Sequence, residues 1–325
     1  MATLVTEPPA VSPSSPPAAP AAKRARVQAE AGTDEYDFIV TISNPHSFKA
    51  LCEIIGNVLI NTHFQMVHSD HFEGVRVDTI DPNSVCMVKA RFACNVWLSP
   101  RCAAEEGGVR VCLRMKTLST LFRHISANHM LNLQRRRGSS DLILRVFNRF
   151  DQTSSMEFVL KTLEQAPVDA SITNIDSQYT VEMMLAQCKT MFKMGKDIKA
   201  AHMRFEIFEN ENSETQTKQT YFCISGVGEE ATARYTFQSA TKEETTEGGQ
   251  TVYALQQQSA SPSVAAMKRV YYENFSTEFL NLFLKSMEKQ TVQITLASNG
   301  PLILHYQLGG DQSVIRFVLA PQVKD

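Results

Sequence analysis

The sequence predicts an α+β protein in which helices pack on antiparallel sheet, with the same architecture present twice. Two observations support this fold class. The order strand, helix, strands, helix, strands runs through the first half of the chain and starts again after a polar stretch at residues 164–178. Each predicted helix also has one apolar face, while the predicted strands are separated by turn residues. The 325 residues, 43% of them hydrophobic, are enough for two domains with real cores.

The composition divides the chain into four predicted parts. Residues 1–34 are rich in Pro, Ala and Ser and contain little that could be buried, which is typical of a disordered tail. Residues 35–163 form the first predicted domain, 164–178 the interdomain linker and 179–325 the second domain. Within the tail, Lys23–Arg26 is a basic cluster of the nuclear-import type, and solvated tail charge is the alternative interpretation.

Two helices are predicted in the first half. The first runs from Ser47 to Asn61 and the second from Lys116 to about Met130, because apolar residues recur with helical spacing in both. The apolar faces are Leu51, Ile54, Ile55, Val58 and Leu59 in the first helix and Leu118, Leu121, Phe122 and Ile125 in the second. The predicted strands are Phe38–Ile42, Phe64–His68, Gly74–Ile80, Val85–Trp97, Val109–Arg114, Asp141–Phe147 and Met156–Leu163.

Two more helices are predicted in the second half, at residues 181–197 and 276–289, again from apolar residues at helical spacing. The predicted strands are Met203–Phe208, Thr220–Ser225, Ala231–Ser239 and Val292–Ala297, followed by a final hairpin that turns at Gly309-Gly310. The polar segments Asn210–Lys218 and Thr241–Ser263 are predicted to be surface loops.

Charge and cysteine usage limit the possible classes of function. The formal net charge is −2, so binding to nucleic acid would have to come from local segregation of charge. Seven cysteines stand singly with no CxxC pair, which indicates reduced thiols in a cytosolic or nuclear protein. No apolar run approaches the roughly 20 residues of a membrane span, and the N-terminus lacks the apolar core of a signal peptide. We therefore expect a soluble intracellular protein.

The C-terminal segment carries the most specific pattern. A predicted helix from Phe275 to Met287 is followed by a strand, a hairpin and a closing Leu319-Ala320-Pro321. This order resembles the C-terminal end of the proliferating cell nuclear antigen (PCNA) family, the eukaryotic-type DNA sliding clamps. The resemblance covers about residues 37–325, is strongest from Phe279 to Pro321, and is moderate in Gly74–Val88.

That resemblance implies a ring-forming clamp fold and no chemistry of its own. A clamp of this kind encircles double-stranded DNA and tethers a DNA polymerase and other replication or repair proteins through a short peptide motif. It assembles as a homotrimer of six domains, needs no cofactor, and is opened by an ATP-driven clamp loader. The expected location is the nucleus, with a viral replication site as the alternative.

Cations recur on the predicted helices away from their apolar faces. With about 100° per residue, Arg123, Lys189 and Lys285 each fall five positions after the first apolar residue of their helix, and Lys49 reaches a similar angle. Lys193 lies nearly opposite the apolar face. A solvated helix face explains any one of these residues. The resemblance implies instead that such helices line the channel of the ring, where the cations meet phosphates without reading bases.

The resemblance also implies a pocket for the partner peptide. The residues at the matching positions are Ile80 at the end of the third predicted strand, Val85 at the start of the fourth, and Val318, Leu319, Ala320 and Pro321 near the end of the chain. The linker completes the pocket, with Val168, Ile172 and Ile175 as its apolar residues. An exposed apolar pocket beside an extended segment suits capture of a short peptide with an aromatic anchor. Ordinary core packing is the alternative for Ile80, Val85 and Val318.

Departures from the family pattern indicate a divergent member of viral or protist origin. Ser84 stands where the closest relatives have His, the first helix is less basic, and the tail and two polar insertions are extra. A subunit of a heterotrimeric checkpoint-type clamp is the first alternative function.

An enzyme of unrecognised type is the second alternative, although no Gly-rich phosphate loop, GxSxG elbow, HExxH or paired-carboxylate motif is present. His68-Ser69-Asp70-His71 lacks the companion ligands of a zinc site. The Arg135–Gly138 run is predicted to be a loop, either solvated or in contact with phosphate at the edge of the ring.

Overall fold

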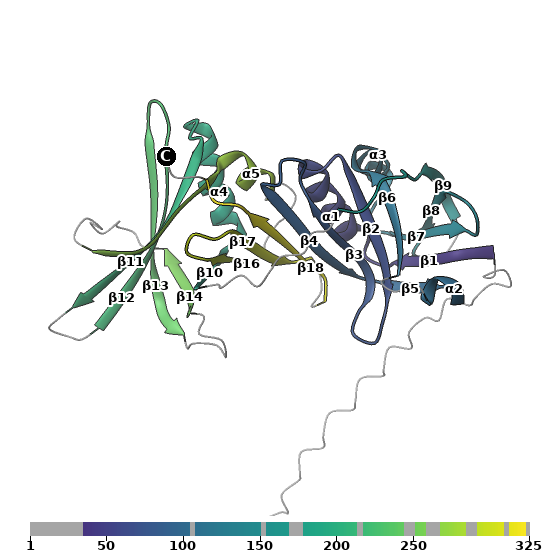
Figure 1. Cartoon of the computed structure of the whole chain (residues 1–325), viewed down its shortest axis with the longest axis horizontal. Coiled ribbons are helices and arrows are strands. Elements are labelled where there is room, and N and C mark those ends of the chain that lie inside the picture. The colour runs from purple at the N-terminus through teal and green to yellow at the C-terminus, as the bar shows by residue number, and fades with distance from the viewer. Residues whose placement is uncertain are drawn as a thin grey trace, which may run out of the picture.

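The computed structural model of the chain describes nine segments, which contain two similar series of elements (Figure 1). These segments are residues 35–104, 108–150, 154–168, 178–212, 217–243, 251–257, 267–283, 291–308 and 312–322. The predicted N-terminal tail and the middle of the predicted linker lie outside them. None of the helices in the described segments is long and apolar enough to cross a membrane.

The first series opens with strand β1 and closes with strand β9. Its elements are β1 (Tyr36–Ile42), α1 (Pro45–Val58), β2 (Asn61–His68), β3 (Glu73–Ile80), β4 (Cys86–Ala93), β5 (Asn95–Leu98), α2 (Pro100–Ala103), β6 (Val109–Arg114), α3 (Met115–Leu121), the 3₁₀ turn η2 (Phe122–His124), β7 (His129–Arg136), β8 (Asp141–Asn148) and β9 (Ser154–Lys161). Helix α1 begins as the sequence favours, because the side chain of Asn44 caps the N–H of Ser47 (3.2 Å) and Pro45 occupies the first turn.

One helix of this series is shorter than its apolar spacing predicts. The second helix was expected to reach Met130, but α3 ends at Leu121 and Ile125 is already extended. The next residues pair with β1 and β8 as strand β7, which the sequence reading missed. The Arg135–Gly138 loop prediction was therefore wrong for Arg135 and Arg136, which lie in β7. Pairing with strands on both sides outweighed local helix propensity here.

The second series repeats the order of the first, from β10 to β18. Its elements are β10 (Tyr179–Met184), α4 (Leu185–Asp197), β11 (His202–Asn212), β12 (Thr217–Val227), β13 (Thr232–Glu243), β14 (Thr251–Gln257), β15 (Lys268–Ser276), α5 (Thr277–Phe283), β16 (Thr291–Leu296), β17 (Leu302–Gln307) and β18 (Val314–Leu319). Helix α4 starts at Leu185, later than predicted, because the preceding residues pair with β16.

Strands β14 and β15 are absent from the sequence prediction. The segment Thr241–Ser263, predicted to be a loop, contains the end of β13 and all of β14. Asn210–Lys218 was likewise predicted to be a loop, yet β11 extends to Asn212 and β12 starts at Thr217. The two segments are rich in polar residues, and the strands in them are held by hydrogen bonds to neighbouring strands. Their local sequence therefore gives little indication of a strand. The predicted Gly309-Gly310 turn lies outside the described residues.

Two sheets hold these strands. One has five strands in the order β5-β1-β7-β8-β9, and the other has thirteen in the order β15-β11-β12-β13-β14-β10-β16-β17-β18-β4-β3-β2-β6. The large sheet crosses from one series to the other at the β18–β4 pair, which is antiparallel from Val314↔Arg91 to Leu319↔Cys86. We call this pair the seam, because it joins the last strand of the second series to the fourth strand of the first.

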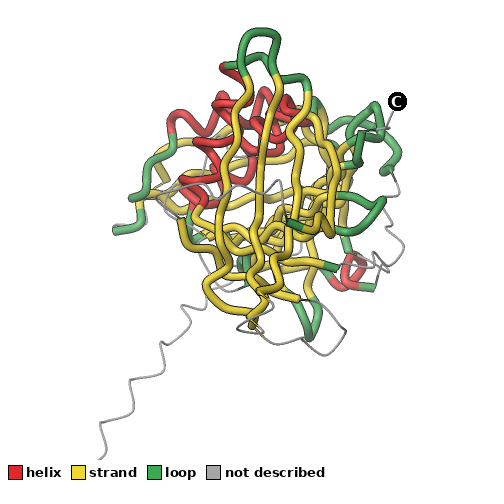
Figure 2. The backbone as a smooth tube through the Cα atoms, turned by 90° about the vertical axis from the view of Figure 1, so that its left-hand side faces the viewer, coloured by secondary structure: helices red, strands yellow, loops and turns green. Residues whose placement is uncertain are grey.

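The four longer helices form one continuous row. Helix α1 packs against both α3 and α5, and α5 packs against α4, which gives the order α3, α1, α5, α4. Figure 2 shows these helices gathered on one side of the strands. Phe48 of α1 contacts Phe92 of β4 with ring centroids 5.1 Å apart, and Phe283 of α5 stacks on Phe317 of β18 at 4.3 Å. Because side chains alternate along a strand, the residues next to Phe92 and Phe317 face away from the helices. We call that side the outer face.

The two series differ at one strand. In the first, β5 pairs with β1 in antiparallel orientation, whereas in the second, β14 pairs with β10 in parallel orientation. Strand β14 also pairs with the second part of β13, so it lies between β13 and β10. The duplication is therefore one of architecture. It is not exact, because one strand of the second half runs parallel to its neighbour where the corresponding strand of the first half runs antiparallel.

Candidate DNA-facing helices and partner-binding surface

The helix row presents cations on the side away from the sheet. Lys193 of α4 and Arg123 of η2 are exposed, while Lys49 of α1 and Lys189 of α4 are half-buried. Lys49 also lies 4.0 Å from Glu53 one turn later, so part of its charge is balanced within α1. Lys285 falls outside the described residues. The structure thus brings four of the five predicted cations onto α1, α4 and the turn that follows α3, and their contact with DNA stays a prediction.

Further cations on the same row were missed by the sequence reading. Lys116 of α3 and Lys196 of α4 are both exposed. Lys189, Lys193 and Lys196 follow one another at i, i+4 and i+7, which places them on one face of α4. That spacing was visible in the sequence and could have identified Lys196. Buried Cys188, Met191 and Phe192 hold the opposite face of α4 against the sheet, and they fix which way the lysines point.

Across the seam, apolar side chains line up on the outer face. The strand registers pair Ile80 of β3 with Met87 of β4, Met87 with Val318 of β18, and Val318 with Ile303 of β17. All four are partly exposed and belong to four adjacent strands. We call them the apolar row. Its members come from both series of elements, so the row exists only because the seam closes.

The predicted pocket residues come together at this place with one exception. The N–H of Ala320 donates to the carbonyl oxygen of Val85 (2.9 Å), which brings the end of the chain beside the turn before β4. Ala320 and Pro321 are partly exposed, whereas Leu319 is fully buried in the core and its side chain has no free surface. Met87 and Ile303 were missed, because only the pairing of strands distant in sequence places them in the row.

A buried carboxylate fixes the turn beside the apolar row. Asp81 is 3% exposed, and its side chain accepts hydrogen bonds from the N–H groups of Asn83 (3.0 Å), Val85 (2.7 Å) and Cys86 (2.5 Å). Ser84, inside this turn, has a φ of 56°, a left-handed conformation that non-glycine residues seldom adopt. The carboxylate therefore stabilises a turn that the residues of the turn would not form readily on their own.

The start of the predicted linker lies on the outer face of β2 and β6. The N–H of Leu163 donates to the carbonyl oxygen of Cys112 (2.9 Å), and Asn61 donates to the side-chain oxygen of Gln165 (3.4 Å). The Nε2 of His63 lies 2.7 Å from the carbonyl oxygen of Gln165. Val168 is 48% exposed at the end of this segment. Ile172 and Ile175, the other apolar linker residues, lie outside the described residues.

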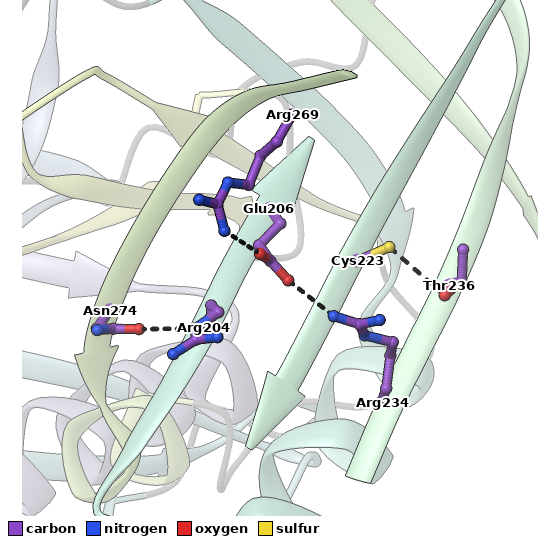
Figure 3. A network of polar contacts seen from close by, with 7 residues as sticks. All are labelled: Arg204, Glu206, Cys223, Arg234, Thr236, Arg269 and Asn274. Carbon is purple, nitrogen blue, oxygen red and sulfur yellow. Dashed lines mark hydrogen bonds and ion pairs between the residues drawn. The ribbon is translucent and has the colours of Figure 1, made fainter. Parts of the chain in front are cut away.

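Another buried carboxylate joins three strands of the second series (Figure 3). Glu206 of β11 is 2% exposed and binds Arg234 of β13 (3.2 Å) and Arg269 of β15 (3.3 Å). Arg204 donates to Asn274 beside it (3.5 Å). Because both arginines are about half exposed, they balance the carboxylate while keeping contact with water. The arrangement links β13 to β11 and β15 through one carboxylate.

The cysteines have the character of core residues. All seven are free, and burial raises the pKa of the thiols of Cys52, Cys86, Cys112, Cys188 and Cys223 and raises that of Cys94 to about 12. Thiols in such surroundings are poor nucleophiles near neutral pH. Across the described segments, no group of three or more His, Cys, Asp or Glu side chains lies close enough to hold a metal ion.

Solved structures with this arrangement exist. Over 88% of this chain and 100% of the other, it matches PCNA from Thermococcus kodakaraensis with a TM-score of 0.64 at 16% identity. It matches PCNA from Entamoeba histolytica with a TM-score of 0.61 at 16% identity, over 89% of this chain and 100% of that one. A PCNA2–PCNA3 complex from Sulfolobus tokodaii matches with a TM-score of 0.61 at 13% identity, over 88% of this chain and 100% of that one.

The chain has the PCNA clamp fold. The matched PCNA chains are covered over their whole length, so the α+β clamp architecture predicted from the sequence is confirmed. At identities of 13–16%, the likeness is one of fold. A scan against protein-family models and a search of curated proteins gave no match.

Proposed function

We propose that this protein is a DNA sliding clamp, a binding protein whose chains assemble into a ring around double-stranded DNA. The observation that carries the proposal is the seam between the two series of elements. At the seam, the last strand of one series completes the sheet of the other through the β18–β4 pair. The same kind of junction can form a second time, between chains.

The strands for that second junction are β9 and β13. Strand β9 ends the first series as β18 ends the second, and β13 has the place in the second series that β4 has in the first. Strand β9 pairs with β8 on one side. In β13, Thr232–Thr236 pair with β12, whereas pairing with β14 starts only at Phe237. Within the described segments, β9 thus has no partner strand along its other edge, and β13 has none along Thr232–Thr236.

Such edges favour pairing with another chain, because their N–H and C=O groups are ready to bond. Joining β9 of one chain to β13 of the next is a head-to-tail contact. It gives a closed ring if the rotation from each chain to the next brings the last chain back to the first. A homotrimer with six domains follows from the resemblance to PCNA. The row α3, α1, α5, α4 would then line the channel. Each chain would contribute two domains, with the predicted bounds 35–163 and 179–325.

The cations of the helix row suit a partner that is held loosely. Lys49, Arg123, Lys189, Lys193 and, outside the described segments, Lys285 would meet phosphates, and phosphate contacts carry no sequence information. The apolar row with Val85, Ala320 and Pro321 would take the peptide motif of a DNA polymerase or another replication or repair protein. A closed ring also requires an ATP-driven clamp loader. Nuclear import through Lys23–Arg26 remains a prediction of the sequence.

Retention on circular DNA tests this function. The clamp is loaded on nicked circular duplex with a clamp loader and ATP, and bound protein is measured before and after the circle is linearised. We expect the wild-type protein to stay on the circle and to leave the linear product, since it is held by topology. Equal retention on circular and linear DNA would contradict the mechanism.

Charge-reversal variants test whether α4, and not another surface, faces DNA. Lys189→Glu with Lys193→Glu should lower the retained amount about tenfold, because several phosphate contacts become repulsive. The matched control is Arg149→Glu, an exposed cation in the β8–β9 turn. If the double variant loads as the wild type does, α4 does not face DNA.

A heteromeric clamp is the alternative within the same fold. One matched structure is a complex of two different chains, PCNA2 and PCNA3. In that case the edges of β9 and β13 would pair with other subunits, and this chain alone would not form a ring.

A further inference from the structure

The outer face beside the apolar row carries a concentration of cations. Two residues along the strands from the apolar row, Arg316 of β18 pairs with Lys89 of β4, and Lys89 pairs with Asp78 of β3. Two residues further, Arg91 of β4 pairs with Arg76 of β3. The row continues through Gln65 of β2 to Arg110 of β6. We call Arg76, Lys89, Arg91, Arg110 and Arg316 the basic patch.

The strand parity shows that this patch shares the face of the apolar row. Lys89 and Arg91 follow Met87 at alternate positions of β4, and Arg316 precedes Val318 by two positions in β18. The intervening residues Val88, Ala90 and Phe317 are buried under the helices. The basic patch is therefore within reach of the residues that flank an anchor on the apolar row, as side chains on one strand face repeat at about 7 Å.

The charge of the patch is only partly balanced within the chain. Asp78 binds Arg76, and it is the one acidic residue on the outer-face positions of β3, β4 and β18 within the described segments. Arg91 lies over the ring of Phe72, 5.9 Å from its centroid, while Arg316 is exposed. Burial and the positive charge of Arg316 also lower the pKa of His305 on the neighbouring strand. The field here is positive although the whole chain has a net charge of −2.

We propose that the partner peptides of this clamp are acidic next to their apolar anchor, with Asp or Glu side chains that bind the basic patch. This inference rests on the proposed function, because it extends the same partner-binding surface. Opposite charge across an interface contributes more to selectivity and association rate than to total affinity. The patch would thus select among anchor peptides by the charge of their flanks. Peptide is favoured over DNA here because the patch adjoins the apolar row and lies on the face away from the helix row.

The test uses the full-length protein and one fluorescein-labelled peptide in three versions. All three have the same pair of aromatic anchor residues, flanked by Asp and Glu, by Ser, or by Lys and Arg. Binding is followed by fluorescence anisotropy at low and at physiological salt. We expect the acidic version to bind about tenfold tighter than the Ser version at low salt, with a smaller difference at higher salt. Equal affinity of these two versions overturns the inference.

Variants locate the effect. Lys89→Glu with Arg316→Glu should remove the advantage of the acidic peptide and favour the basic one, while the Ser version binds as before. Arg101→Glu, which changes an exposed cation of α2, is the matched control and should alter none of the three affinities. If the double variant instead loses affinity for a labelled duplex and keeps the peptide preference, the patch is a nucleic-acid surface and the inference is wrong.

The apolar row is tested separately. Met87→Ser should weaken all three peptides alike, because it removes the anchor contact and leaves the charges. If none of the three binds to the wild-type protein, the partner-binding surface of the proposed function fails and the inference fails with it. If all three bind equally and Met87→Ser weakens them, the surface stands and only the charge preference is refuted.

Discussion

At the scale of single residues, buried carboxylates stabilise elements on which the proposed function depends. Asp81 accepts three backbone hydrogen bonds in the turn beside the apolar row. Asp81→Ala leaves these N–H groups without their acceptor, so we expect a loss of about 1–3 kcal/mol in the free energy of unfolding. Peptide affinity should fall as well, because the turn positions Val85.

Chemical denaturation and peptide anisotropy check this prediction together. Asp81→Asn keeps one side-chain carbonyl oxygen and should be affected less than Asp81→Ala. Unchanged stability and unchanged peptide affinity in Asp81→Ala would show that the turn forms without the carboxylate.

Glu206 and its arginines give an asymmetric prediction. The carboxylate is 2% exposed, whereas the side chains of Arg234 and Arg269 are 44% and 51% exposed. Replacing both arginines with Gln leaves an unpaired buried charge, which costs about 3 kcal/mol or more. Glu206→Gln leaves two cations that can turn to water, so its cost should be smaller. Urea denaturation compares the two variants; a larger loss in Glu206→Gln would contradict this assignment.

Some residues of the candidate partner-binding surface could be predicted from the sequence and others could not. The positions of Ile80, Val85 and Val318 follow from the order of elements and the segments that resemble the clamp family. Met87 and Ile303 do not, because they join the apolar row only through strand registers across the seam. Leu319 shows the opposite case, since adjacency to Val318 in sequence puts its side chain on the other side of the strand, in the core.

At the scale of elements, long amphipathic helices were predicted best and strands with polar residues worst. Helices α1 and α4 have several turns of apolar spacing and were found within a few residues of their ends. Strands β14 and β15 were missed because their structure depends on pairing with β10, β13 and β11. Whether such a segment forms a strand depends on its register and on its neighbouring strands, and the local sequence pattern predicts neither.

The edge of β9 provides the element-scale prediction. Val159 is 58% exposed in this strand, so Val159→Asp should change the stability of the single chain by less than about 0.5 kcal/mol. In a ring closed through β9, the new charge would lie on a strand that must pair with another chain, and because charges on an edge strand disfavour such pairing, assembly should weaken about tenfold. Sedimentation velocity measures the shift towards monomer. Ile60→Asp, which changes a residue 74% exposed after α1, is the control. If the two variants assemble alike, β9 is not the interface.

At the scale of the whole molecule, the thirteen-stranded sheet makes the two series one structural unit. The seam produces both the continuous helix row on one face and the apolar row on the other, so the two candidate surfaces, one for DNA and one for partner peptides, depend on one strand pair. Sequence alone predicted the repeated architecture, since the order of elements is local information. The long-range pairing of β18 with β4 needed the folded chain.

In the proposed assembly, this chain closes a ring with itself by pairing β9 of one copy with Thr232–Thr236 of β13 in the next. Light scattering across a concentration series measures this most directly. We predict a stable molar mass of three times the 36.3 kDa of the chain, unchanged on dilution through the micromolar range. A mass of one chain at every concentration would contradict a self-closing ring and would direct the search to partner subunits.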